Sequence, residues 1–544
     1  MIKNQLLKVT VLSFSLLALP VMAQKTLHVN ISNGDDGNDG LKWSTAFKNI
    51  QPAIDAAVKG DTIKVAKGTY FPTNRISGSS SSLGDRDRCF LFRRNIKIYG
   101  GFPAGATDIT TMNDRNWEKN ITILSGDFNN DDGDNFKNTD ENAYHVVVML
   151  NATAEMQLDG FYITGGNGNS ENSVSAVNID NLHVMHTCGG GIYAVAKANS
   201  SPTLSNLVIR DNKVDRDGGG LYLHSDGGDV SPTLTNVSMI NNVAKFWGGA
   251  YYSKGKGATP KLKNVIITGN ESVQGGGLIC MTEEKDCSPE FENVLISGNK
   301  ANKSGGIFLH AMATDARPVF INTTICGNKA TTDYAVGGIY ILSTSGEANP
   351  YIKNTVIWGN KSNLKETDNI YTEGGRATNP VYTNSFIEGT HTGGTNLNGN
   401  MNPMFVNHID ADFAPTVYNQ GDYRLYAESP LINKGDNSAV SLTKDLAGQD
   451  RIYNNTVDIG AYESKYNTSS NEAIVKNNPI WSYQGNLYVK INNNTATMCA
   501  YSINGILVKQ INNLGDGTHA LPMPEGLYII KLSTGESAKV LIKN

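Results

Sequence analysis

The sequence predicts an all-β protein whose main part is a right-handed parallel β-helix, with a short capping helix before it and a small β-sandwich after it. Three observations predict this fold class. A proline recurs every 28–32 residues, a glycine pair precedes each proline, and asparagine stands four places after each one. A fixed period of this length indicates a solenoid. The prolines are Pro202, Pro232, Pro260, Pro289, Pro318, Pro350 and Pro380.

The residues between these markers determine the kind of solenoid. Short β-branched runs such as Val265–Ile267 end at Gly, Asn or Asp, which is typical of strands and turns. A unit of about 29 residues is too short for a propeller blade and fits three strands and three turns. Parallel crossovers turn right-handed, which gives the hand. The glycine pairs are Gly190-Gly191, Gly219-Gly220, Gly248-Gly249, Gly276-Gly277, Gly305-Gly306, Gly337-Gly338 and Gly374-Gly375.

Columns of equivalent residues indicate how the coils are held together. Successive parallel strands lie about 4.8 Å apart, so asparagines one period apart are predicted to form a hydrogen-bonded ladder. Its members are Asn206, Asn236, Asn264, Asn293, Asn322, Asn354 and Asn384. Three places further along, an apolar column is predicted to fill the core. It comprises Ile209, Met239, Ile267, Ile296, Ile325, Ile357 and Ile387.

The two ends of the chain differ from the repeat. Lys3, Lys8 and an apolar run to Leu19 predict a secretory signal at 1–23, with an N-terminal anchor as the alternative. Residues 24–464 are assigned to the β-helix, with regular repeats over about 186–390 and a capping helix near 46–58. A polar linker at 465–474 precedes a predicted β-sandwich at 475–544.

Charge and cysteine content limit the partners and cofactors. Loss of Lys3 and Lys8 with the signal takes the formal charge from −5 to −7, which argues against nucleic acid as a partner. The chain has no Cys-x-x-Cys pair, so a structural zinc site is not expected. Cys280 and Cys287 could form a disulfide in an oxidising compartment, whereas Cys89, Cys188, Cys326 and Cys499 are explained as well by buried apolar side chains.

An aromatic row is the main candidate for ligand binding. The second residue of the strand after each glycine pair is predicted to face outward, and five of six are aromatic. Aromatic rings at about 4.8 Å spacing offer a stacking platform for sugar rings. The alternatives are a covered aromatic stack or simple β-propensity. The candidate residues are Tyr193, Tyr222, Tyr251, Phe308 and Tyr340.

An enzyme and a structural stalk are the competing functions. A polysaccharide lyase or glycoside hydrolase needs clustered carboxylates or basic groups, and the regular coils show no such cluster in register. An active site would therefore fall in the irregular coils before residue 190, where Asp85–Arg88, Arg93 and Arg94 form a charged segment. That segment is equally explained as a solvated surface, and His183 with His186 as a structural pair.

A calcium site is predicted in the same region. Asp127, Asn129, Asp131 and Asp134 alternate as the oxygen ligands of a calcium loop do. The segment departs from the EF-hand pattern, because Gly133 stands at the seventh place and no bidentate Glu follows at the twelfth.

Several segments resemble known bacterial surface proteins. Residues 33–47 with 60–65 resemble the opening of pectin-lyase-like surface β-helices, and the glycine-rich repeat is similar to polymorphic outer-membrane adhesins. Residues 423–463, ending in Val457-Asp-Ile-Gly-Ala-Tyr-Glu463, resemble the choice-of-anchor Q group. Asn478-Pro479, Asn504-Gly505, Gly526–Tyr528 and Lys539–Lys543 resemble a type IX secretion sorting domain.

These resemblances imply an exported protein that does not span the membrane in its mature form. The secretion machinery would recognise the C-terminal domain, remove it, and attach the protein to the outer membrane or release it. The expected ligands are extracellular polysaccharides or surface glycans, bound for adhesion.

Overall fold

The computed structural model describes most of the chain after the predicted signal. The described residues are 23–76, 84–170, 176–332, 335–362, 369–376, 378–389, 394–412, 420–465, 479–483, 486–491, 495–502, 506–533 and 537–542. The predicted signal, apart from Ala23, and the predicted linker, apart from Lys465, lie outside them. The chain divides into two compact units between Tyr466 and Asn467. None of the described helices is long and apolar enough to span a membrane.

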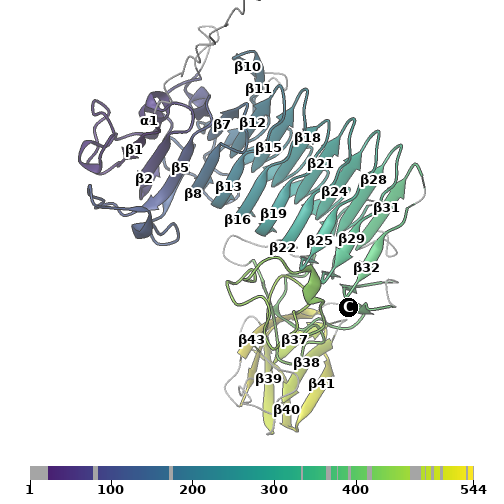
Figure 1. The fold of residues 1–544 in the computed structure, drawn as a ribbon. Helices are drawn as coiled ribbons and strands as arrows, with labels where there is room; N and C mark the ends of the chain where they lie inside the picture. The colour runs from purple at the N-terminus through teal and green to yellow at the C-terminus, as the bar shows by residue number, and fades with distance from the viewer. Residues whose placement is uncertain are drawn as a thin grey trace, which may run out of the picture. The chain divides into compact units, whose positions relative to one another are not determined.

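The first unit is a parallel β-helix, which confirms the predicted fold class (Figure 1). Within the described residues its coils form three parallel sheets, here called sheets I, II and III. Sheet I has 17 strands, namely β1 (Thr26–Val29), β2 (Thr62–Ala66), β3 (Gly68–Tyr70), β5 (Lys97–Phe102), β6 (Thr122–Ser125), β8 (Gln157–Thr164), β13 (Thr203–Arg210), β16 (Thr233–Ile240), β19 (Lys261–Thr268), β22 (Glu290–Ser297), β25 (Val319–Ile321), β26 (Thr324–Cys326), β29 (Tyr351–Lys353), β30 (Val356–Trp358), β32 (Val381–Thr383), β33 (Phe386–Ile387) and β34 (Leu397–Asn398).

Sheets II and III complete each coil. Among the described residues sheet II has nine strands, namely β4 (Phe90–Phe92), β7 (Val147–Leu150), β12 (Ile192–Ala196), β15 (Leu221–Ser225), β18 (Tyr251–Gly255), β21 (Leu278–Thr282), β24 (Ile307–Ala311), β28 (Ile339–Ser343) and β31 (Ile370–Gly374). Sheet III has six in the same part of the chain, namely β9 (Asn167–Gly168), β14 (Lys213–Val214), β17 (Val243–Ala244), β20 (Glu271–Ser272), β23 (Lys300–Ala301) and β27 (Lys329–Ala330).

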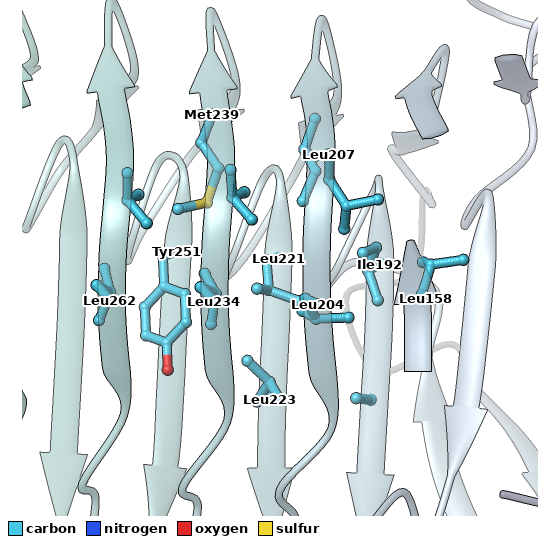
Figure 2. Packing of buried hydrophobic residues seen from close by; sticks show 14 of the residues in the cluster. Leu158, Ile192, Leu204, Leu207, Leu221, Leu223, Leu234, Met239, Tyr251 and Leu262 are labelled. Atoms are coloured by element: carbon cyan, nitrogen blue, oxygen red, sulfur yellow. The ribbon is translucent and has the colours of Figure 1, made fainter. Parts of the chain in front are cut away.

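The strand register aligns the predicted columns. Leu204 pairs with Leu234 and Leu234 with Leu262, while Ile209, Met239 and Ile267 pair in the same way. These side chains are fully buried and meet the inward-facing residues of sheet II in one continuous core (Figure 2). The apolar interior therefore runs along the whole solenoid, and each coil depends on its neighbours for burial.

The predicted asparagine ladder is present at the corner within sheet I for four of its seven members, whereas Asn322, Asn354 and Asn384 donate to backbone carbonyls of the segment 431–464. Asn236 donates to Asn206 at 3.1 Å, Asn264 to Asn236 at 3.1 Å and Asn293 to Asn264 at 3.2 Å. All seven members have φ between 46° and 55°, a left-handed conformation that asparagine tolerates better than most residues. The corner conformation and the ladder thus both select asparagine here.

A second asparagine ladder lies inside the solenoid, ten places after the prolines. Each side-chain oxygen accepts from both the backbone N–H and the side-chain amide of the preceding member. The side-chain amide also donates to backbone carbonyls, so these buried groups are satisfied. The ladder comprises Asn212, Asn242, Asn270, Asn299, Asn328 and Asn360.

The predicted capping helix is present as α1 (Ile50–Ala56). Ile50, Ala53 and Ile54 are buried and join the solenoid core, so the helix covers its open end. Pro52 stands in the first turn, where its missing N–H costs no helical hydrogen bond.

The segment 431–464 packs against the later coils. The corner asparagines there donate to its backbone: Asn293 to the carbonyl of Lys444, and Asn354 to that of Asp436. The segment is held by Arg451, which is 1% exposed and donates to the carbonyls of Asp458 and Gly460.

Two antiparallel hairpins and the second unit complete the fold. The hairpins pair β10 (Ala176–Ile179) with β11 (Leu182–Met185), and β35 (Phe405–Asn407) with β36 (Asp422–Leu425). The second unit is a β-sandwich with one shared apolar core, as predicted. Its sheets contain β37 (Ile480–Tyr483), β38 (Asn486–Ile491) and β41 (Gly517–Pro522), and β39 (Ala496–Ser502), β40 (Leu507–Leu514), β42 (Gly526–Leu532) and β43 (Ser537–Ile542).

The cysteines are free thiols. Cys280 and Cys287 are both buried, and the Cys287 thiol donates to the carbonyl of Cys280 at 3.6 Å. No disulfide joins them in this structure. Cys89, Cys188 and Cys326 are buried as expected, whereas Cys499 is half-buried.

Candidate functional site

The predicted aromatic row does not form an exposed platform. Tyr193, Tyr222, Phe308 and Tyr340 do lie on the outer face of sheet II, but all four are at most 6% exposed. The rings stack along the axis, with centroids 4.8 Å apart for Tyr193 and Tyr222. The alternative of a covered aromatic stack is therefore correct for these four residues.

Tyr251 was assigned to the wrong column. It pairs with Leu221 and Leu278 and lies in the solenoid core, whereas Tyr252 pairs with Tyr222 on the outer face (Figure 2). The reason is Ala250, which occupies the third place of a small-residue triplet that is Gly218–Gly220 in the preceding coil. Counting from Gly248-Gly249 shifts the predicted register by one residue. A shift of one residue along a strand moves each side chain to the opposite face of the sheet.

Different elements cover the stack along its length. The Tyr193 hydroxyl donates to the carbonyl of His183 and accepts from the backbone N–H of Met185, so the β10–β11 hairpin covers this end. Further along, the ammonium of Lys303 lies 4.9 Å from the centre of the Tyr340 ring. The flanking side chains thus remove the predicted platform from solvent.

An open aromatic pocket lies beside the stack, in the turns that precede β15 and β18. It has a volume of about 300 Å³ and is lined by Arg216, Asp217, Phe246 and Trp247. We call it the Trp247 pocket. The Trp247 ring is nearly parallel to that of Tyr252, with centroids 6.2 Å apart, and Phe246 is 53% exposed. The pocket therefore offers aromatic surface that a ligand can reach.

The backbone of these turns places the pocket residues side by side. Asp217 and Trp247 form a parallel bridge between adjacent coils. The next residues, Gly218 and Gly248, have φ of 68° and 65°, and a Cβ at Gly248 would lie 2.3 Å from the carbonyl oxygen of Tyr251. Glycine is thus required immediately after Asp217 and immediately after Trp247. This backbone conformation fixes the positions of the two residues in their turns.

Asp217 gives the pocket a buried acidic group. The residue is 4% exposed, and its Oδ1 atom has no hydrogen-bond partner among the described residues. Burial raises the pKa of the carboxyl to about 6, against the opposing effects of Arg216, the Trp247 backbone and Lys254. Arg216 Nη2 lies 4.0 Å from Asp217 Oδ2, at the limit of an ion pair. The Oδ1 atom is itself enclosed, so a ligand in the pocket meets this carboxyl group only at its small exposed edge, since the side chain is 6% exposed.

The predicted calcium ligands are only partly brought together. Asp127 lies in a cluster with Asp132 and Glu141, whose oxygen atoms are within 4.8 Å of one another. Asp131 and Asp134 are not in this cluster of acidic groups, and the charge of Asp134 acts instead on Asp211. Burial raises the pKa of Asp132 to about 6, opposed by Asn142 and reinforced by nearby carboxylates.

The charged segment of the irregular coils is partly buried rather than uniformly solvated. Asp87 Oδ1 lies 2.8 Å from His186 Nε2, and both side chains are buried. Tyr144 stacks on His186 at 4.4 Å, and Arg86 lies over Tyr144. Burial lowers the pKa of neighbouring His145 to about 3, so that imidazole is neutral. These contacts pack the segment onto sheet II, which agrees with a structural role for His186.

Sequence reasoning missed Arg216, Asp217, Phe246 and Trp247. One signal was available, because Phe246-Trp247 directly precedes its glycines and the corresponding positions of the other coils hold no aromatic pair. The covering of the tyrosine row had no such signal, since it depends on a hairpin inserted elsewhere in the chain.

Comparison with solved structures finds several similar chains, among them a pectate lyase. The structure resembles the crystal structure of pectate lyase Pel9A, with a TM-score of 0.41 and 14% sequence identity; the alignment covers 81% of this chain and 97% of that chain. No protein-family model matches the sequence. No curated protein matches it either.

Proposed function

We propose that this protein binds glycans at the Trp247 pocket and is displayed outside the cell for adhesion. The observation that carries the proposal is the combination of reachable aromatic surface with a guanidinium and a carboxyl group in the same pocket lining. Sugar rings present an apolar face that packs on aromatic rings and hydroxyls that donate to carboxylates. Phe246 and Trp247 supply the first interaction, and Asp217 the second.

The electrostatics of the pocket favour a neutral saccharide. Arg216 and Asp217 contribute opposite charges, so an uncharged ligand leaves the pocket balanced. Hydroxyl groups of the ligand can bond to the Arg216 guanidinium and to the exposed edge of the Asp217 carboxyl group.

A glycan array with the full mature protein tests the proposal. The same polysaccharides are incubated with the protein and assayed for reducing ends and unsaturated products. Binding that is lost in Asp217→Asn, with no product formed, supports glycan binding. Product release would instead identify a polysaccharide-degrading enzyme, and absence of binding to every glycan would leave a structural stalk.

Export and sorting are a separate part of the proposal. Residues 1–23 are proposed as a cleaved secretory signal and residues 475–544 as a type IX sorting domain, on the resemblances of their sequences. Mass spectrometry of the mature protein should find Gln24 as the first residue. Deletion of 475–544 should abolish surface display while the β-helix still accumulates inside the outer membrane; unchanged display would contradict the sorting role.

A further inference from the structure

A second, polar cleft opens near the capped end of the solenoid. It has a volume of about 530 Å³ and is lined by α1, the segment 73–75 and the end of β4. Its polar side chains are Gln51, Asp55, Asn74, Arg75 and Arg93. We call it the Asp55 cleft. A volume of this size is typical of sites for small ligands.

The Asp55 carboxylate is fixed within the cleft. Gln51 donates to its Oδ1 at 2.9 Å, and Asn74 donates to its Oδ2 at 3.3 Å. Gln51 is itself held by both backbone groups of Leu91. Each carboxylate oxygen has two lone pairs, so Asp55 retains acceptor capacity toward a ligand.

The two arginines at the rim of the cleft, Arg75 and Arg93, each form an ion pair with an aspartate. Arg75 pairs with Asp85, and Arg93 donates from Nη1 to both oxygens of Asp180 at 2.6 Å. The Arg75 side chain lines the cleft, is 53% exposed and uses Nη2 for this pair. Donors and acceptors therefore alternate around a nearly neutral cleft, an arrangement that suits a polyhydroxylated ligand.

A residue that lines the cleft and a ring beside the Trp247 pocket belong to the same outer column of sheet II. Leu91, which lines the cleft, stands in the outer column that continues through Val148, Tyr193 and Tyr222 to Tyr252. Four strand spacings of about 4.8 Å separate Leu91 from Tyr252, or about 19 Å along the axis. The β10–β11 hairpin lies over Tyr193, between the two.

We infer that the Asp55 cleft is a second saccharide-binding site and that one polysaccharide chain occupies both sites. This inference rests on the proposed function of the Trp247 pocket. The chain would lie along the solenoid axis and pass the β10–β11 hairpin. Engagement of a second linked site becomes intramolecular, which raises the affinity for long chains above that of either site alone.

Titration calorimetry with fragments of the glycan identified on the array tests the inference. The wild-type protein should bind two molecules of a short fragment but one long chain, and the long chain should bind about 10²-fold or more tightly. Arg75→Ala and Asp55→Asn should each reduce the stoichiometry for the short fragment to one and remove the gain for the long chain.

Arg317→Ala is the matched control, because its side chain is 51% exposed and paired with Asp286 and Asp315 outside the cleft. This variant should leave unchanged both the number of short fragments bound and the affinity for the long chain. One bound fragment in the wild type, unaffected by Arg75→Ala and Asp55→Asn, would overturn the second site while the Trp247 pocket stands. Two bound fragments without tighter binding of long chains would overturn the spanning chain. Two bound fragments of unchanged affinity in Asp217→Asn and Phe246→Ala would instead contradict the Trp247 pocket.

Discussion

Asn242 donates from its side-chain amide to the side-chain oxygen of Asn270 at 3.0 Å, joining two coils from inside the solenoid. The same oxygen accepts the backbone N–H of Asn242 at 2.8 Å. Asn270→Leu would leave both donors unpaired in a buried site, at about 1–3 kcal/mol for each. We expect a lower free energy of unfolding, measured by denaturant titration followed by circular dichroism.

Asn236→Leu serves as the comparison, because Asn236 occupies the exposed part of the corner ladder. Water can replace its lost hydrogen bonds, but leucine would adopt the left-handed conformation poorly, at about 1–2 kcal/mol. The loss should therefore be smaller than for Asn270→Leu. An equal loss in both variants would contradict the role assigned to the internal ladder.

The fold was predictable from the sequence because, in a parallel solenoid, residues one repeat apart in the sequence lie in contact. The positions of Asn236, Asn264 and Asn293 were enough to place their amides in one ladder. The candidate site was less predictable, for two physical reasons. Ala250 is small enough to replace a glycine, which hid the register of Tyr251, and the covering of Tyr193 depends on a hairpin that belongs to no repeat.

Phe246→Ala should weaken glycan binding without affecting the fold. The ring is 53% exposed, so its removal creates no cavity in the core. Loss of a ring contact worth about 0.5–1.5 kcal/mol corresponds to a roughly 3- to 10-fold higher Kd, measured by calorimetry. Tyr351→Ala, which removes a 37% exposed ring from sheet I, is the control and should bind normally.

Glycan affinity should fall as the pH decreases through about 6. The raised pKa of Asp217 means that its carboxyl becomes neutral there, and a neutral acid accepts a hydroxyl proton less strongly than a carboxylate. Asp217→Asn should bind weakly at every pH, with a flat profile between pH 5 and pH 8. A wild-type profile that is equally flat would exclude Asp217 from ligand binding.

The same raised pKa has the opposite effect on the stability of the free protein. The folded state favours the neutral acid, so this contribution is fully present below the ordinary carboxyl pKa and is lost as the pH rises through about 6. Asp217→Asn should therefore unfold at a higher temperature than the wild type at pH 8, and the difference should shrink toward pH 4.

Arg451→Met should release the segment 431–464. Arg451 is buried beside Glu463, whose pKa is raised to about 8 by burial and by Asp458 against the opposing effect of Arg451. Without Arg451 the carbonyls of Asp458 and Gly460 lose their donor, at about 1–3 kcal/mol for each. Hydrogen exchange over 431–464 should accelerate. Lys444→Met breaks only an exposed pair with Asp450 and should change the exchange little.

Calcium is expected to bind at Asp127, Asp132 and Glu141 rather than at the four residues predicted from spacing. Glu141 Oε1 is buried without a hydrogen-bond partner among the described residues. Calcium should raise the Tm of the wild type and should have no effect on Asp132→Asn. Asp134→Asn is the control and should respond as the wild type does, since Asp134 lies outside the cluster. A Tm independent of calcium would rule out the site.

The column from Leu91 to Tyr252 also fixes the distance between the two sites as a whole number of strand spacings. The chain crosses sheet II once per coil, so the gap between the two openings changes only in steps of about 4.8 Å. Gain or loss of a whole repeat leaves matching faces on either side of the join, and the fold tolerates it. The same event would change the distance between the Asp55 cleft and the Trp247 pocket by one strand spacing. Duplication of a repeat within the gene would therefore match the two sites to a different spacing along a polymer.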